Sequence, residues 1–224
     1  MKSLMALFMM TAGALLVVAG SASAQTSAPA PAADESKGYV EGFAQSAFGN
    51  VTSQSYGGEV GVTFHSHLQV FGEFGQIRNV ATASLGTSAS AIAGALTQLQ
   101  SAAVDYTVKE PVAFAVGGVR YLIPTTTKLQ PYVLGGFGLA KVTNDVVFKL
   151  GGTEATASSL AQYVTIGTDL SGDVTKPMMT FGGGVVWPAW QQLVVDLQFR
   201  FGRILTDDEA ITVGRIGLGV GVRF

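Results

Sequence analysis

From Ile216 to Phe224, bulky apolar residues occupy every second position of the chain. A period of two places alternate side chains on opposite faces of a β-strand, so this segment is predicted to be a strand with two unlike faces. One face holds Ile216, Leu218, Val220, Val222 and Phe224, and the other holds Arg215, Gly217, Gly219, Gly221 and Arg223. A face of glycine and arginine suits the narrow interior of a barrel, while the bulky aliphatic face suits lipid.

The preceding segment repeats this arrangement. Leu193, Val195, Leu197, Phe199 and Phe201 share one face, whereas Asp196, Gln198 and Arg200 share the other. Two successive strands with a polar face and a bulky apolar face indicate a sheet whose two sides meet different surroundings.

The composition points to a membrane as one of those surroundings. Only 12% of the residues are charged and 48% are hydrophobic, whereas soluble domains carry about 25% charged residues. After the first 24 residues, no run approaches the roughly 18 apolar residues of a transmembrane helix. In hydrocarbon the backbone must satisfy its own hydrogen bonds, and a closed barrel is the non-helical solution. The chain is therefore predicted to be all-β, as a transmembrane antiparallel up-and-down β-barrel.

The N-terminus has the features of a secretory signal. Lys2 is followed by an apolar stretch from Leu4 to Gly20 and by the small residues Ala22-Ser23-Ala24. Residues 1–24 are predicted to be a cleaved signal peptide, and an uncleaved membrane anchor is the alternative. Residues 25–37 are rich in alanine and proline and are interpreted as a flexible periplasmic leader. The barrel is predicted over 38–224.

Six more segments with strand character precede the last two, and the connections between them alternate in length. The segments are Tyr39–Phe48, Tyr56–Phe64, Leu68–Asn79, Val112–Ile123, Gln130–Thr143 and Met178–Trp187. Tight turns at 65–67, 124–128 and 188–191 alternate with the long stretches 80–111 and 144–177 and with the shorter stretches 49–55 and 206–210. Outer-membrane barrels have an even number of strands, short periplasmic turns and longer extracellular loops. The pattern predicts eight strands in the cell outer membrane, with both termini periplasmic.

The two longest loops are where a specific surface role would reside, because the barrel presents them outward. In the first, apolar residues recur at helical spacing and predict a short amphipathic helix. These residues are Leu85, Ala89, Ile92, Leu96, Leu99 and Ala103. The second loop has a weaker helical pattern at 159–164. Residues 80–111 and 144–177 could therefore meet an extracellular partner, or the loops could simply pack on each other.

Aromatic residues gather near the predicted periplasmic end of the strands. Rings with polar tips favour the membrane interface, so a periplasmic aromatic girdle is predicted. Its members are Tyr39, Phe64, Tyr121, Tyr132, Trp187 and Trp190, with Phe224 at the same level.

Two motifs carry a family resemblance, which covers roughly Gly38 to Phe224. Gly118-Val119-Arg120-Tyr121 leads to a turn, and Gln130-Pro131-Tyr132-Val133-Leu134-Gly135-Gly136-Phe137-Gly138 follows it. With the alternating last strand, these segments resemble eight-stranded outer-membrane barrels typified by the transmembrane domain of outer-membrane protein A. The resemblance implies contact with outer-membrane lipid, and it implies that Phe224 and its alternating partners are a signal for the barrel-insertion machinery. No peptidoglycan-binding domain follows the barrel in this sequence, so no cell-wall tether is implied.

Charged residues on the inward parity form the main candidate site. They are Glu59, Glu73, Arg120, Asp196, Arg200, Arg215 and Arg223. Such charges could form an ion path or gate, or they could form a salt-bridge network that fills the barrel. An eight-stranded barrel is only just wide enough for its own side chains. The structural network is therefore the favoured interpretation.

Candidate catalytic and metal-binding residues are few. The chain has no cysteine, which excludes disulfides, thiol nucleophiles and thiolate ligands. Its two histidines, His65 and His67, flank Ser66 in a predicted turn. Two ligands are too few for a zinc site, and no acidic residue lies nearby to orient a Ser–His pair. A polar turn is favoured over a hydrolase, and no catalytic, cofactor-binding or metal-binding residue is predicted.

The sequence thus predicts a non-enzymatic outer-membrane protein with a structural or loop-displaying role. A narrow pore for small solutes and a lipid-modifying enzyme are the alternatives, and a soluble periplasmic barrel is the competing fold. Basic residues number 13 against 15 acidic ones and are not clustered. No nucleic-acid partner is therefore predicted.

Overall fold

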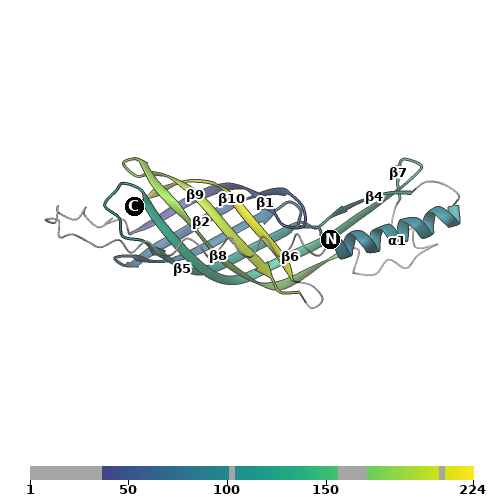
Figure 1. Ribbon diagram of the computed structural model, residues 1–224, viewed down its shortest axis with the longest axis horizontal. Coiled ribbons are helices and arrows are strands. Elements are labelled where there is room, and N and C mark those ends of the chain that lie inside the picture. Colours follow the sequence, from purple (N-terminus) through teal and green to yellow (C-terminus); the bar gives the residue numbers. More distant parts are fainter. Residues whose placement is uncertain (1–36, 101–103, 156–170, 207–209) are drawn as a thin grey trace, which may run out of the picture. The chain divides into compact units, whose positions relative to one another are not determined.

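The computed structural model describes residues 37–100, 104–155, 171–206 and 210–224, and its strands form a closed barrel (Figure 1). Eight strands make the ring, and each is antiparallel to both of its neighbours. In ring order they are β1 (Gly38–Phe48), β2 (Ser53–His65), β3 (Leu68–Ile77), β5 (Val112–Leu122), β6 (Gln130–Leu150), β8 (Ser171–Trp190), β9 (Leu193–Ile204) and β10 (Ile211–Arg223). Since β10 pairs back with β1, the ring has no free edge. The predicted all-β, eight-stranded up-and-down barrel is confirmed.

The start of β1 and the end of β10 lie together at one end of the barrel. The Gly38 amide donates to the Phe224 carbonyl and the Phe224 amide to the Gly38 carbonyl, each at 3.0 Å. The short connections 66–67, 123–129 and 191–192 lie at this same end, the turn end of the barrel. The two longest connections, together with 49–52 and 205–210, lie at the opposite end, the loop end.

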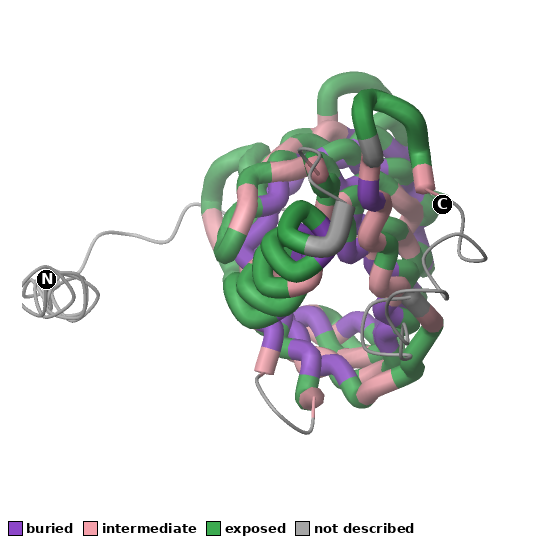
Figure 2. Tube along the Cα trace, turned by 90° about the vertical axis from the view of Figure 1, so that its right-hand side faces the viewer, coloured by how far each residue is buried: buried purple, intermediate pink, exposed green. Residues whose placement is uncertain are grey.

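Apolar side chains cover the outside of the barrel. Val60, Phe74, Phe137, Leu197 and Leu218 are each 44–58% exposed, although a water-soluble sheet would bury them. Around the ring, buried positions alternate with exposed ones (Figure 2). An outer face of this kind fits a lipid surrounding and not the competing soluble barrel. No helix within the described residues is both long and apolar enough to cross a membrane.

The interior is layered from end to end. At the loop end an apolar cluster includes Ile77, Val112, Met178 and Ile204. At the turn end a second cluster includes Phe71, Leu134, Val186 and Val194. Between these two apolar layers lie the charged side chains of the candidate site.

An arm extends from the loop end, made of α1 (Ala83–Gln100), β4 (Val104–Lys109), β7 (Thr153–Glu154) and residues 143–150 of β6. β4 pairs with Asp145–Leu150 of β6, and β7 pairs with Lys149 and Leu150 (Figure 1). Ala89, Ala93 and Leu96 of α1 pack with Phe148 of β6 in a small core.

The arm both confirms and corrects the expectations for the long loops. The helix predicted from the spacing of Leu85, Ala89, Ile92 and Leu96 is present. β4 was not expected, and β6 and β8 were expected to end at Thr143 and begin at Met178. They are longer because β8 stays paired with β6 as far as Asp145, and β4 pairs with β6 beyond it. The helical pattern at 159–164 and the leader before residue 37 lie outside the described residues.

Candidate functional site

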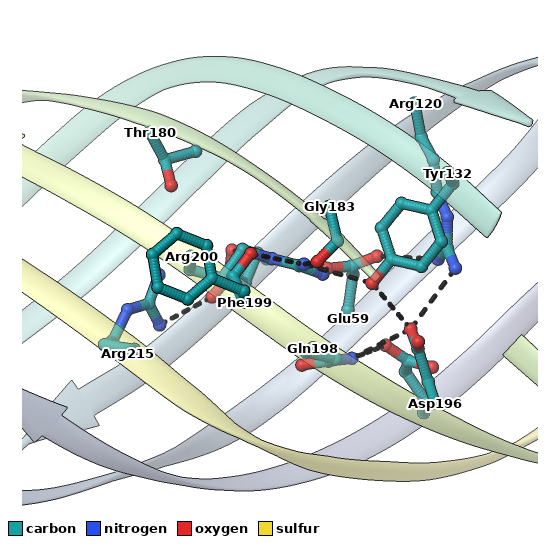
Figure 3. Close-up of polar contacts among 12 residues, drawn as sticks. Glu59, Arg120, Tyr132, Thr180, Gly183, Asp196, Gln198, Phe199, Arg200 and Arg215 are labelled. Carbon is teal, nitrogen blue, oxygen red and sulfur yellow. Dashed lines mark hydrogen bonds and ion pairs between the residues drawn. The ribbon is translucent and has the colours of Figure 1, made fainter. Parts of the chain in front are cut away.

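Glu59 on β2 is the centre of a buried charge network inside the barrel (Figure 3). Its Oε1 lies 3.2 Å from Arg120 Nη1, and its Oε2 lies 3.0 Å from Arg200 Nη2. Arg120 also reaches Asp196 Oδ2 at 3.2 Å. These contacts join strands β2, β5 and β9 across the interior, so the network cross-links the barrel wall from within.

A second branch runs toward the loop end. Arg215 Nη1 on β10 lies 2.7 Å from Glu73 Oε1, and Arg200 Nε lies 3.8 Å from Glu73 Oε2. Arg215 also donates to Gln45 Oε1 at 3.3 Å, and Gln45 Nε2 donates to Gln198 Oε1 at 2.8 Å. The two branches share Arg200, so they form one continuous network.

Two tyrosines belong to this network. The Tyr39 hydroxyl donates to Glu59 Oε1 at 2.5 Å, and the Tyr132 hydroxyl donates to Asp196 Oδ2 at 2.8 Å. The Arg120 guanidinium lies over the Tyr132 ring, 3.5 Å from its centroid, and 4.8 Å from that of Tyr39. Stacking of a guanidinium on two rings fixes its orientation in addition to its ion pairs.

The network carries opposite charges in similar numbers. Four carboxylates and three guanidiniums are buried in the barrel, namely Glu41, Glu59, Glu73, Asp196, Arg120, Arg200 and Arg215. Gln198 Nε2 donates to both Glu41 Oε1 and Asp196 Oδ2 and so bridges two of the carboxylates. Removing one member of such a buried set leaves its partner charge without compensation, which costs about 3–5 kcal/mol.

Six of the seven predicted inward charges therefore meet in one cluster: Glu59, Glu73, Arg120, Asp196, Arg200 and Arg215. Arg223 is placed differently. It is partly exposed and lines a small pocket of about 30 Å³ at the turn end, with Tyr39, Gln69 and Leu122.

The predicted aromatic girdle needs a correction at two positions. Tyr39 and Tyr132 are 6% and 2% exposed, and both point into the barrel. Each shares its parity with inward residues, whereas the outward positions next to them are Val40 and Val133. The other predicted members do lie exposed on the outside near the turn end: Phe64, Tyr121, Trp187, Trp190 and Phe224.

Sequence reasoning also missed Glu41 and Gln45 as interior residues, and it placed Gln198 on the inward face without naming it as part of the site. The available signal was parity: Glu41 and Gln45 alternate with the outward residues of β1, and Gln198 lies between Asp196 and Arg200. The facing of β1 was ambiguous because Tyr39, Glu41 and Phe43 mix polar and apolar character on one face.

The histidine turn brings its residues together without an acidic partner. The Nδ1 atoms of His65 and His67 each lie 3.1 Å from Ser66 Oγ, and both side chains are solvent-accessible. In the described part of the chain, no carboxylate forms a hydrogen bond with either imidazole. No cluster of metal-ligating side chains occurs among the described residues either.

Comparison with solved structures finds other proteins with this architecture. Neisserial surface protein A matches 84% of this chain and 98% of its own, at 15% identity and a TM-score of 0.54. The fold is that of an eight-stranded outer-membrane β-barrel. A major outer membrane protein from Thermus thermophilus matches 84% of this chain and 99% of its own, at 10% identity and a TM-score of 0.51. The N-terminal β-barrel domain of Pseudomonas aeruginosa OprF matches 84% and 98%, at 14% identity and a TM-score of 0.49. No protein-family model and no curated protein matches the sequence.

Proposed function

We propose that this chain is a non-enzymatic outer-membrane protein that displays its arm at the cell surface. The observation that carries the proposal is the pairing of a filled interior with an ordered arm. Arg120, Arg200 and Arg215 are at most 2% exposed in the middle of the barrel, and apolar layers lie on both sides of them. The barrel is thus a rigid base, and the arm extends from it at the loop end.

The filled interior argues against the pore alternative. Ion pairs and tyrosine rings occupy the cross-section that an ion path would need. The charges then serve to join strands from within and not to select a solute. Stable, reproducible conductance steps from the refolded protein in a planar bilayer would overturn this part of the proposal.

The orientation is part of the same proposal. Short turns are periplasmic in outer-membrane barrels, so the turn end, with Gly38 and Phe224, faces the periplasm. Residues 1–24 then act as the signal peptide and residues 25–37 as the periplasmic leader. The outward alternation ending at Phe224 serves the insertion machinery, as the family resemblance implies.

Single cysteines in this cysteine-free chain test the orientation directly. Ser88→Cys places a thiol on the exposed side of α1, and Thr126→Cys places one in the exposed turn between β5 and β6. Intact cells are treated with a polymer-linked maleimide too large for outer-membrane pores. We expect labelling of Ser88→Cys in intact cells, and of Thr126→Cys only after the outer membrane is permeabilised. The reverse pattern would refute surface display of the arm.

A further inference from the structure

A groove of about 670 Å³ opens on the outer surface of the barrel at the loop end. Its floor is a row of outward positions that are cross-strand partners: Tyr56 pairs with Gln76, Gln76 with Ala113, and Ala113 with Lys141. Arg78 and Lys109 complete its polar wall. Three cations and no carboxylate line this groove, which is unusual for a chain with more acidic than basic residues.

The groove lies directly above the apolar belt. One step toward the middle of the strands, the outward residues are Phe74 on β3 and Leu139 on β6, which are 58% and 55% exposed. Two residues along a strand advance by about 6.6 Å. Lys141 therefore lies one such step from Leu139, and Arg78 lies two steps from Phe74, at the depth where a bilayer changes from hydrocarbon to head groups.

The cations are arranged to receive an anion. Arg78 donates to Gln54 Oε1 at 2.9 Å, which holds its guanidinium beside the groove without neutralising it. Lys141 Nζ lies 2.6 Å from Asp173 Oδ2, and both side chains of this ion pair are about half exposed to solvent. Lys109 faces Asp145 across the β4–β6 ladder, and among the described residues it forms no ion pair. The local charge of the lining is therefore positive.

We propose that this groove binds the phosphate of a phosphate-bearing lipid in the outer leaflet. Arginine and lysine are the side chains that best match phosphate oxygens. Below the groove the outward positions of β5 are small, namely Ala113, Ala115 and Gly117, and Phe74 and Leu139 flank them. An acyl chain can lie along that strip while its head group meets the cations. Assignment of the outer leaflet rests on the orientation proposed above.

Binding can be tested on the purified mature protein in dodecyl maltoside micelles. The probes are diphosphorylated lipid A, the same lipid A without its phosphates, and inorganic phosphate, and retained lipid is counted by native mass spectrometry. We expect one diphosphorylated lipid to be retained in preference to the dephosphorylated form. The variant Arg78→Gln/Lys109→Gln/Lys141→Gln should bind it about tenfold more weakly, because each exposed charge contact contributes modestly.

A matched variant controls for general charge attraction. Lys37→Gln/Lys128→Gln/Lys149→Gln removes three cations from elsewhere and should bind as the parent does, and both variants should keep the gel mobility of the folded barrel. The proposal would be overturned if lipid binding weakened equally in the two variants, or if it weakened in neither. It would also be overturned if the dephosphorylated lipid were retained equally well, or if millimolar inorganic phosphate displaced the bound lipid. Micelle binding does not depend on orientation in a cell, so its failure is distinct from failure of the maleimide experiment.

Discussion

Inward glycines decide which large side chains the narrow interior can hold. A Cβ added to Gly61 would lie 2.2 Å from Cε1 of the Tyr39 ring, and one added to Gly184 would lie 2.5 Å from the Tyr132 hydroxyl. Each glycine thus makes room for a tyrosine of a neighbouring strand, and that tyrosine in turn holds a carboxylate of the network. The glycine-rich inner face seen in the sequence is the space that the network occupies.

Gly61→Ala is expected to destabilise the barrel by about 1–3 kcal/mol, the usual cost of overpacking a filled core. The new methyl group would displace the Tyr39 ring and weaken its hydrogen bond to Glu59. Gly72→Ala is the matched control, because its Cβ points outward and meets only Val60 Cγ2 at 3.9 Å. The free energy of unfolding of both variants can be measured by urea unfolding in phospholipid vesicles, followed by tryptophan fluorescence. Equal stability of the two variants would contradict this role for Gly61.

Glu59→Gln tests the ion pairs at their shared residue. The amide keeps the shape of the side chain but removes the charge that faces Arg120 and Arg200. We expect a loss of about 3–5 kcal/mol in the free energy of unfolding, because two buried guanidiniums lose their common partner. The same unfolding experiment should show no measurable loss for Asp173→Asn, whose pair with Lys141 is about half exposed. A loss for Glu59→Gln no larger than that for Asp173→Asn would show that the network adds nothing to stability.

For single residues, the alternation of inward and outward positions along each strand located most of the buried charges. It could not reveal which charge pairs with which. Glu59 and Arg200 are 141 positions apart, and their contact depends on the curvature and tilt of the wall. The sequence predicts Tyr39 at the membrane interface because tyrosines near strand ends often lie there. Its hydroxyl instead satisfies a buried carboxylate, which only the closed barrel brings within reach.

The junction between the arm and the barrel depends on one buried carboxylate. Thr82 precedes α1, and its backbone amide donates to Glu110 Oε2 at 2.9 Å. The Glu110 amide and the Ala81 amide both donate to Asn79 Oδ1 at 3.0 Å. The chain entering α1 is thereby tied to the chain leaving β4. Burial raises the pKa of the Glu110 carboxyl, against the opposing effect of its hydrogen bonds with Thr82.

The raised pKa of Glu110 predicts that the junction tightens on acidification. A carboxyl with a raised pKa in the folded arm favours the protonated form, so the junction is firmest below the ordinary pKa of about 4.3 and weakens as the pH rises through the raised value. A nitroxide on Ser88→Cys should therefore become more mobile as the pH rises above about 4. Glu110→Gln keeps an acceptor for Thr82 without a buried charge, and should hold α1 firmly at all these pH values. Greater mobility in Glu110→Gln would contradict the argument.

Elements were predictable where their periodicity was long. The helical spacing from Leu85 to Leu96 identified α1, and the alternation identified β9 and β10, although β9 continues past the predicted Phe201 to Ile204 and β10 begins at Ile211, ahead of the predicted segment. β4, which reads Val-Asp-Tyr-Thr-Val-Lys, is too short to show a period by itself. It is a strand because the exposed edge of β6 runs beside it, which is a tertiary cause that the local sequence does not contain.

The ring is closed by the pairing of β1 with β10. The first and last strands pair from Tyr39 and Arg223 to Phe48 and Gly214, so the two ends of the wall are held by a full ladder of hydrogen bonds. Alternating loop lengths predict an even number of strands, but they do not predict which residue of β1 meets which residue of β10. That register follows from the tilt of all eight strands together.

A cross-strand disulfide tests both closure and register. Val40 and Val222 are direct partners, both point outward, and the parent chain has no cysteine to interfere. Opposite residues of an antiparallel pair have Cα atoms about 4.5–5.5 Å apart, within the range that a disulfide spans. Val40→Cys/Val222→Cys should therefore oxidise in the folded state and give a boiled, unreduced gel band that migrates differently from the reduced one. Val40→Cys/Val70→Cys, whose second residue lies on β3, should give no such band.

By linking the two ends of the wall, the disulfide should also stabilise the barrel by about 2–4 kcal/mol. Failure of the first pair to oxidise in the folded protein, or oxidation of both pairs alike, would contradict the β1–β10 register and with it the closure of the ring at eight strands.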